Sequence, residues 1–146
     1  MTRLRILHLG LGAFHRAHQA VYLQDLIDAG DTRWELAGGH IRPERPDTAE
    51  LLKAQGGAYT VETVTPDGGL AYRRIEALRT PVPYRADLAE LQSLAADPAT
   101  RIISFTVTEA GYADDSAPVS TAAGHTIYGA LTTLLRARQH SGAGPV

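Results

Sequence analysis

The sequence predicts a doubly wound α/β domain with a mainly parallel sheet. Short apolar runs alternate along the chain with segments whose apolar residues recur every three to four positions, which is the pattern of strands alternating with helices. The opening run, residues 5–9, passes through two glycines into a helical segment, and the run at 101–108 is β-branched and almost continuously apolar. Parallel strands need crossover connections, so these observations favour one sheet covered on both faces.

The first predicted unit is a strand, a glycine turn and a helix. Residues 5–9 are mostly apolar and stop at Gly10, as expected for a buried parallel strand. Apolar residues at 14–27 then fall at helical spacing, and Gly30 is placed to end that single helix as a C-terminal cap.

A second strand and a second helix follow. Residues 34–41 predict the strand, and the small Gly38 and Gly39 indicate that another backbone approaches closely there. Residues 47–50 have the spacing of a capping box, which opens a short helix that the glycines at 56–57 close.

The next segment predicts an inserted β-hairpin. Residues 59–64 alternate with a period of two, residues 66–69 are turn formers, and residues 70–75 can return as the second strand. This pair of strands need not join the main sheet.

The last third of the chain predicts a helix, a strand and a helix. Residues 87–90 repeat the capping-box spacing before a helix that the Asp-Pro pair at 97–98 stops. The strand at 101–108 follows. The final helix begins near Ile127 and carries cations in its last turns, where they suit the helix dipole: Arg136, Arg138 and His140.

Composition narrows the choice of partners. The 146 residues are 44% hydrophobic and 21% charged, as in globular domains, and the formal net charge of -2 provides no basic field for nucleic acid or anionic lipid. We therefore expect a small-molecule partner. The chain has no cysteine, which excludes disulfides and thiolate chemistry, so the cytoplasm is the expected location. No apolar run is long enough for a membrane span or an export signal.

The turn between the first strand and the first helix predicts a dinucleotide site. Two glycines there allow a tight turn and let a pyrophosphate approach bare backbone, whose N–H groups can donate to it. This placement is typical of Rossmann-like domains. The third glycine of the usual fingerprint is replaced by His15, and the alternative is a plain strand-to-helix turn. The predicted cofactor contacts are Gly10, Leu11, Gly12, Ala13 and Phe14.

Residues after the second strand are predicted to read the adenosine ribose. An acid there favours the free 2′-hydroxyl of NAD, whereas an arginine favours the 2′-phosphate of NADP. Both Arg42 and Glu44 follow the strand, so NAD is favoured through Glu44 while NADP stays open. The alternative is a solvated charged loop.

The carboxyl end of the strand at 101–108 is the third part of the predicted site, because ligands of open α/β sheets bind at that end. Thr106 and Thr108 are predicted to contact the cofactor. Glu109 is a candidate for moving protons if it lies buried near substrate, and otherwise it is an exposed loop residue.

The histidines do not predict a metal site. His15 and His18 lie three residues apart at a helix start, but no carboxylate or further histidine falls at ligand spacing on that helix. His8 alternates with apolar neighbours in a strand, which is typical of an interior histidine whose ring nitrogens are hydrogen bonded.

Four segments carry a resemblance to a known family. They are ILHLGLGAFHRAHQ at 6–19, GGHIRP at 38–43, GAYTVETVTP at 57–66 and IISFTVTEAGY at 102–112. Together they resemble the mannitol dehydrogenase family of polyol-specific long-chain dehydrogenases. The second and third segments resemble its D-arabinitol-oxidising branch most, and the similarity extends over nearly the whole chain.

The resemblance implies an activity and a division of labour. Members oxidise a secondary alcohol of a polyol to a ketose by passing hydride to NAD, and the turn that matches residues 11–14 lies beneath the pyrophosphate. Their catalytic lysine, with an asparagine and a histidine, belongs to a helical C-terminal domain that packs on this one. Lys53 does not match that lysine. Glu109 matches a glutamate that is linked to proton release in the family. Because the lysine, asparagine and histidine belong to the C-terminal domain, no complete catalytic set is expected in this chain.

The resemblance also predicts where the chain departs from the family. Segment 113–126 is shorter than its family counterpart, and residues 141–146 resemble a loop that leads to a further strand. We therefore interpret residues 1–146 as one dinucleotide-binding domain, truncated before the catalytic domain. It is expected to bind cofactor without turnover, and the alternative is a non-catalytic dinucleotide-binding remnant or sensor module.

Overall fold

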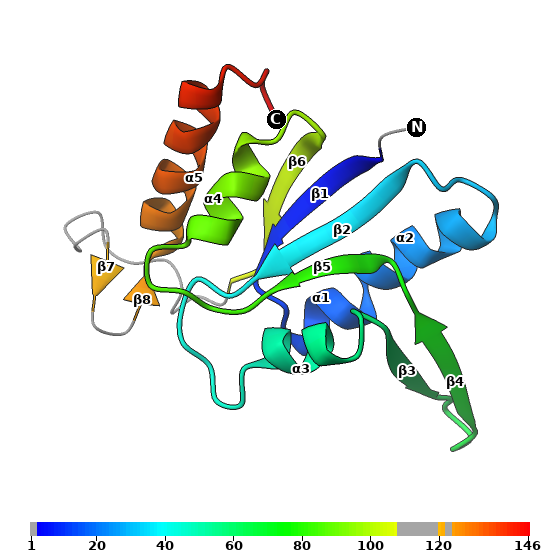
Figure 1. The fold of residues 1–146 in the computed structure, drawn as a ribbon. Helices are drawn as coiled ribbons and strands as arrows, with labels where there is room; N and C mark the ends of the chain where they lie inside the picture. Colours follow the sequence, from blue (N-terminus) through cyan, green and yellow to red (C-terminus); the bar gives the residue numbers. More distant parts are fainter. Residues whose placement is uncertain (1–2, 108–119, 122–123) are drawn as a thin grey trace.

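A computed structural model of the chain describes residues 3–107, 120–121 and 124–146. Its main sheet has four parallel strands in the order β5-β2-β1-β6, with the bounds Leu78–Val82, Trp34–Gly39, Leu4–Leu9 and Thr100–Phe105. The chain runs outward from β1 to β2 and β5 and then returns to β6 on the other side of β1 (Figure 1). The predicted doubly wound α/β class is therefore confirmed, and the strand order reverses between β1 and β6.

Helices cover both faces of this sheet, and each face has its own apolar core (Figure 1). Neighbouring residues of one strand enter opposite cores, because strand side chains alternate between faces: Leu36 joins one cluster and Ala37 the other. The first cluster contains residues of α2 (Gln19–Asp28) and α3 (Thr48–Ala54). The second contains residues of α4 (Ala89–Ala96) and α5 (Ile127–Ser141).

The first helix is broken in two, so the prediction of one continuous helix is wrong. α1 spans Ala13–Ala17 and α2 begins at Gln19, with His18 at φ −123° and ψ −82° between them. The Nδ1 atom of the His18 ring lies 2.8 Å from the carbonyl oxygen of Phe14, which the backbone N–H of His18 would use in a continuous helix. The side chain therefore competes with the backbone for the same acceptor.

The predicted helix ends are partly confirmed. Gly30 follows α2 at φ +96°, and its N–H donates back to Ile27, as in a glycine C-terminal cap. Asp47 caps α3 by accepting from two backbone N–H groups. The second predicted capping box is wrong, because Leu88 is the N-terminal cap of α4 and makes no side-chain cap bond. Leu88 is instead buried in the core, with φ +53°.

The inserted hairpin is confirmed, and three of the described strands were not predicted. β3 (Tyr59–Val64) and β4 (Leu70–Ile75) pair antiparallel in a sheet of their own. β5 was missed because Arg79 and Pro81 interrupt its apolar pattern, and a proline is tolerated there since β5 lies at an edge of the sheet. A short antiparallel pair, β7 (Ser120–Thr121) and β8 (Gly124–His125), was also not predicted.

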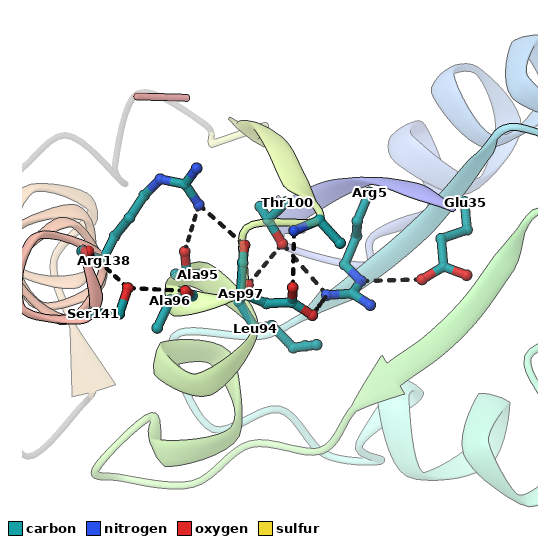
Figure 2. Close-up of polar contacts among 10 residues, drawn as sticks. Arg5, Glu35, Leu94, Ala95, Ala96, Asp97, Thr100, Arg138 and Ser141 are labelled. Atoms are coloured by element: carbon teal, nitrogen blue, oxygen red, sulfur yellow. Dashed lines mark hydrogen bonds and ion pairs between the residues drawn. The ribbon is translucent and has the colours of Figure 1, made fainter. Parts of the chain in front are cut away.

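Two arginines organise the amino end of the sheet (Figure 2). The Arg5 guanidinium on β1 donates to Glu35 at 3.1 Å and to Asp97 at 2.8 Å. Arg138 on α5 is only 4% exposed and donates to the carbonyl oxygens of Ala95 and Asp97. The cation thus binds the carboxyl end of α4, where helix carbonyls lack partners in their own helix.

Candidate functional site

A pocket of about 360 Å³ opens at the carboxyl end of the sheet, where the strand order reverses. This is the position at which open α/β sheets bind their ligands. Five of the predicted cofactor-binding residues line it, although they come from three distant parts of the sequence: Gly10, Gly12, Arg42, Glu44 and Thr106. The fold therefore brings the predicted turn, ribose loop and strand end together.

The glycine turn needs its glycines for two different reasons. Gly10 has φ +103°, in the region that favours glycine, and its N–H donates to the Gly39 carbonyl at 2.8 Å. Gly12 is the N-terminal cap of α1 at φ −64°, and a Cβ added there would meet no described atom within 4 Å. The space over the Gly12 backbone is thus open to a ligand, next to the first turn of α1, whose N–H groups lack helical partners.

The other residues of the turn differ in how they face the pocket. Leu11 is fully buried, and its side chain packs in the core formed with α2 and α3, so it offers only backbone to a ligand. Ala13 is exposed. Phe14 is 65% exposed and its ring stacks on that of His18, with centroids 4.3 Å apart. Both Phe14 and His18 line a second pocket of about 360 Å³ on the other side of Thr106.

The predicted ribose loop follows β2 directly. Glu44 lies with a carboxylate oxygen 3.0 Å from Nε2 of His40, and this carboxylate stays 43% exposed. The Arg42 guanidinium donates to the His125 carbonyl at 3.0 Å, which directs its charge toward β8. Sequence reasoning did not include His40 in the site, although its position directly after β2 is the signal that could have found it.

Two stacked imidazoles lie beneath the glycine turn. The rings of His8 and His15 are parallel within 12°, with centroids 3.8 Å apart, and both residues are 1% exposed. Burial lowers the pKa of His8 to about 3 and that of His15 to about 4, because burial penalises the charged form. His15 thus replaces the usual third glycine as a packing contact between α1 and β1, and it does not line the pocket over Gly12.

The prediction that His8 is hydrogen bonded in the interior is confirmed. Its Nδ1 lies 2.8 Å from the Ser104 hydroxyl, and its Nε2 lies 3.1 Å from the Thr106 hydroxyl. The Gln19 side chain interacts with the His15 ring and partly offsets the lowering of the His15 pKa by burial.

Other predicted residues lie elsewhere. Thr108 and Glu109, and most of the segment 113–126, fall outside the described residues. Lys53 lies on α3, with Nζ 3.9 Å from a carboxylate oxygen of Glu90, and it does not line the pocket.

Within residues 3–107, 120–121 and 124–146, no group of three or more histidines and acids is placed to hold a metal ion. The helices of those ranges include none long and apolar enough to cross a membrane.

A parallel sheet whose order reverses beside a glycine turn defines a Rossmann-type dinucleotide-binding domain. Residues 4–146 match the Rossmann domain of mannitol dehydrogenase. The chain therefore belongs to the mannitol dehydrogenase family, as the sequence motifs predicted.

Comparison with individual proteins supports the same conclusion. The chain is 46% identical to a D-arabinitol 4-dehydrogenase of Ralstonia nicotianae, over 97% of this chain and 33% of the relative. It is 43% identical to the D-arabinitol 4-dehydrogenase of Klebsiella pneumoniae, over 96% of this chain and 33% of the relative. A ternary complex of Pseudomonas fluorescens mannitol 2-dehydrogenase with NAD and D-mannitol superposes with a TM-score of 0.80 at 28% identity, over 99% of this chain and 32% of that one. The chain thus spans about a third of the length of these relatives.

Proposed function

We propose that this chain is the cofactor-binding domain of an NAD-dependent polyol dehydrogenase, which oxidises a secondary alcohol of a sugar alcohol such as D-arabinitol to a ketose. The observation that carries the proposal is the open pocket over the Gly12 backbone at the reversal of strand order. The names of the similar proteins supply the substrate class and the cofactor. The proposed location is the cytoplasm.

The residues of the pocket fit the parts of a dinucleotide in order. The loop after β2, with Arg42 and Glu44, would hold the adenosine ribose. The backbone from Gly10 to Phe14 would hold the pyrophosphate, because bare amides can approach its oxygens. Thr106 at the end of β6 would then face the nicotinamide half, which supplies the hydride acceptor when it is bound. The Glu44 carboxylate, which is 43% exposed, suits a ribose 2′-hydroxyl and repels a 2′-phosphate, which supports NAD over NADP.

The chemical step needs groups that the described residues do not bring to the pocket. Proton removal by a positioned base contributes about 10²–10⁴-fold to such reactions. The family resemblance assigns that base to a lysine of a second domain that packs on this one, and assigns proton release to Glu109. We therefore propose that the chain binds NAD(H) by itself but turns over polyol only together with that domain.

Calorimetric titration of the chain with NADH and with NADPH tests this proposal. We expect NADH to bind more tightly than NADPH, and no oxidation of D-arabinitol in the presence of NAD. If neither nucleotide binds while circular dichroism shows a folded α/β protein, the proposal is wrong. The alternative of a non-catalytic binding module makes the same binding prediction, and it is favoured instead if joining the chain to the remaining two thirds of a relative yields no turnover.

A further inference from the structure

His8, one of the two stacked histidines beneath the turn, connects the pocket to β6. His8 lies on β1 two residues before Gly10, and it bonds two hydroxyls of the neighbouring strand segment, those of Ser104 and Thr106. Ser104 in turn lies 3.4 Å from the amide group of Gln19 on α2. A continuous set of hydrogen bonds therefore runs from α2 through His8 to Thr106.

This set of bonds ends at the ligand side of the turn. The Thr106 hydroxyl lies 4.0 Å from the position that a Cβ of Gly10 would occupy, so it borders the glycine turn directly. Thr106 also lines both pockets, the one over Gly12 and the one beside Phe14. Its hydroxyl is thus the polar side-chain group at the boundary between them.

The ring of His8 can hold this hydroxyl in one orientation. Because burial keeps the imidazole neutral, one ring nitrogen carries a proton and the other accepts. A threonine hydroxyl has one donor and two acceptor positions, so a single bond to His8 leaves capacity for a ligand in either tautomer. The His15 ring stacked 3.8 Å away fixes the plane of the His8 ring.

We propose that His8 is a positioning residue for the nicotinamide half of the dinucleotide, and that it acts by orienting the Thr106 hydroxyl toward that half. The proposal rests on the proposed function. The loop after β2 takes the adenosine on one side of the glycine turn, so the other half of the ligand must extend toward β6, where Thr106 lies. The partner of the hydroxyl is a polar group of that half, a sugar hydroxyl or a carboxamide.

The test compares two ligands, NADH and ADP, in calorimetric titrations of the whole chain. ADP contains the adenosine and pyrophosphate but lacks the nicotinamide half. We expect His8→Leu and Thr106→Val each to weaken NADH binding by about 3- to 10-fold, the range of one net hydrogen bond, and to leave ADP binding unchanged within about twofold. The double variant should bind NADH no more weakly than Thr106→Val, because His8 acts through Thr106.

A matched control lies on the same strand. Thr100 is a fully buried threonine at the amino end of β6, and its hydroxyl donates to the Leu94 carbonyl. Thr100→Val should lower stability without changing either affinity. The proposal is overturned if His8→Leu weakens both ligands equally, if it weakens neither, or if it weakens NADH further in the Thr106→Val background. If the unaltered chain binds neither ligand, the proposed function itself is refuted and this inference with it.

A measurement on the unaltered chain keeps the proposal testable if His8→Leu does not fold. In ¹⁵N spectra of the histidine rings, NADH should shift the His8 resonances while ADP leaves them in place. Equal shifts with both ligands, or none with NADH, would overturn the assignment.

Discussion

The amino end of the main sheet is closed by polar contacts, whereas its carboxyl end leaves glycine backbone beside a pocket. At the amino end Arg5 and Arg138 donate to carboxylates and to carbonyls that end a helix (Figure 2). At the carboxyl end Gly10 and Gly12 present bare backbone, and Thr106 presents a hydroxyl. The polar contacts at the amino end of the four strands therefore stabilise the fold, whereas the groups at their carboxyl end are available to a ligand.

The two ends should therefore be separable by mutation. A substitution at the amino end is expected to change the free energy of unfolding without changing nucleotide affinity. A substitution in the glycine turn is expected to do the reverse. Four changes test this separation, in order of decreasing effect.

Arg138→Met should give the largest effect. It leaves the buried carbonyl of Ala95 without its donor and removes a donor from the carbonyls of Asp97, Gly144 and Pro145. Since each unsatisfied buried group costs about 1–3 kcal/mol, we expect the free energy of unfolding to fall by about 3 kcal/mol. Urea unfolding followed by circular dichroism measures this, with NADH affinity of the folded variant as the control. A loss below about 1 kcal/mol would show that the cation contributes little there.

Gly12→Val should abolish binding and spare the fold. The Cβ of the valine would enter the space over the turn and meet no described atom within 4 Å, and φ −64° suits any residue. We expect NADH affinity to fall more than about 100-fold, roughly 2.7 kcal/mol, while stability changes by less than about 0.5 kcal/mol. Unchanged NADH affinity in calorimetry would show that the pyrophosphate does not bind at this turn.

Asp97→Asn should reveal an acid-dependent contribution at the amino end. The hydrogen bond from Arg5 holds the pKa of Asp97 below its ordinary value. As the pH falls, the Asp97 carboxylate of the unfolded chain is therefore protonated at a higher pH than that of the folded chain. Its contribution to the free energy of unfolding is complete above a pH of about 3.9 and is lost as the pH falls through the lower pKa of the folded state.

The size of that contribution is limited by solvent. The Asp97 side chain is 39% exposed, so screening keeps the loss at neutral pH below about 1 kcal/mol. Urea unfolding of both proteins at pH 7 and near pH 2 should give a difference that shrinks in acid. A difference that stays constant with pH would mean that the charge of Asp97 contributes nothing.

Glu44→Ala should give the smallest effect, at the outer edge of the pocket. If its carboxylate binds the ribose 2′-hydroxyl, the preference for NADH over NADPH should fall by about 2- to 4-fold, the low end of the range of one net hydrogen bond, because the carboxylate is 43% exposed. Calorimetry with both nucleotides measures the ratio. Arg45→Ala in the same loop is the matched control. If it changes the preference for NADH over NADPH as much as Glu44→Ala does, the preference depends on the overall charge of the loop and not on Glu44.

The carboxyl end was easier to predict from sequence than the amino end, because its signals are local. The two glycines at the end of β1 and the Asp47 cap are each readable within a few residues. The Arg5–Asp97 ion pair joins residues 92 positions apart in the sequence, and no short-range sequence pattern predicts such a contact.

Elements that failed prediction depend on tertiary position. β5 is a strand because it pairs with β2 at the sheet edge, despite Pro81. The break at His18 is the exception, because it accompanies a local contact between the His18 ring and the Phe14 carbonyl. The stacking of His15 on His8 depends on how α1 packs against β1. Sequence alone therefore could not show whether His15, in place of the usual third glycine, keeps or loses the packing contact between helix and strand.

The central claim is that bare backbone at the Gly10–Gly12 turn holds the diphosphate of a dinucleotide. A crystal structure of this chain grown with NAD tests it most directly. We predict diphosphate density over Gly12, with adenosine toward Glu44 and nicotinamide toward Thr106. Density for NAD at another place, with the space over Gly12 filled by protein atoms, would contradict it.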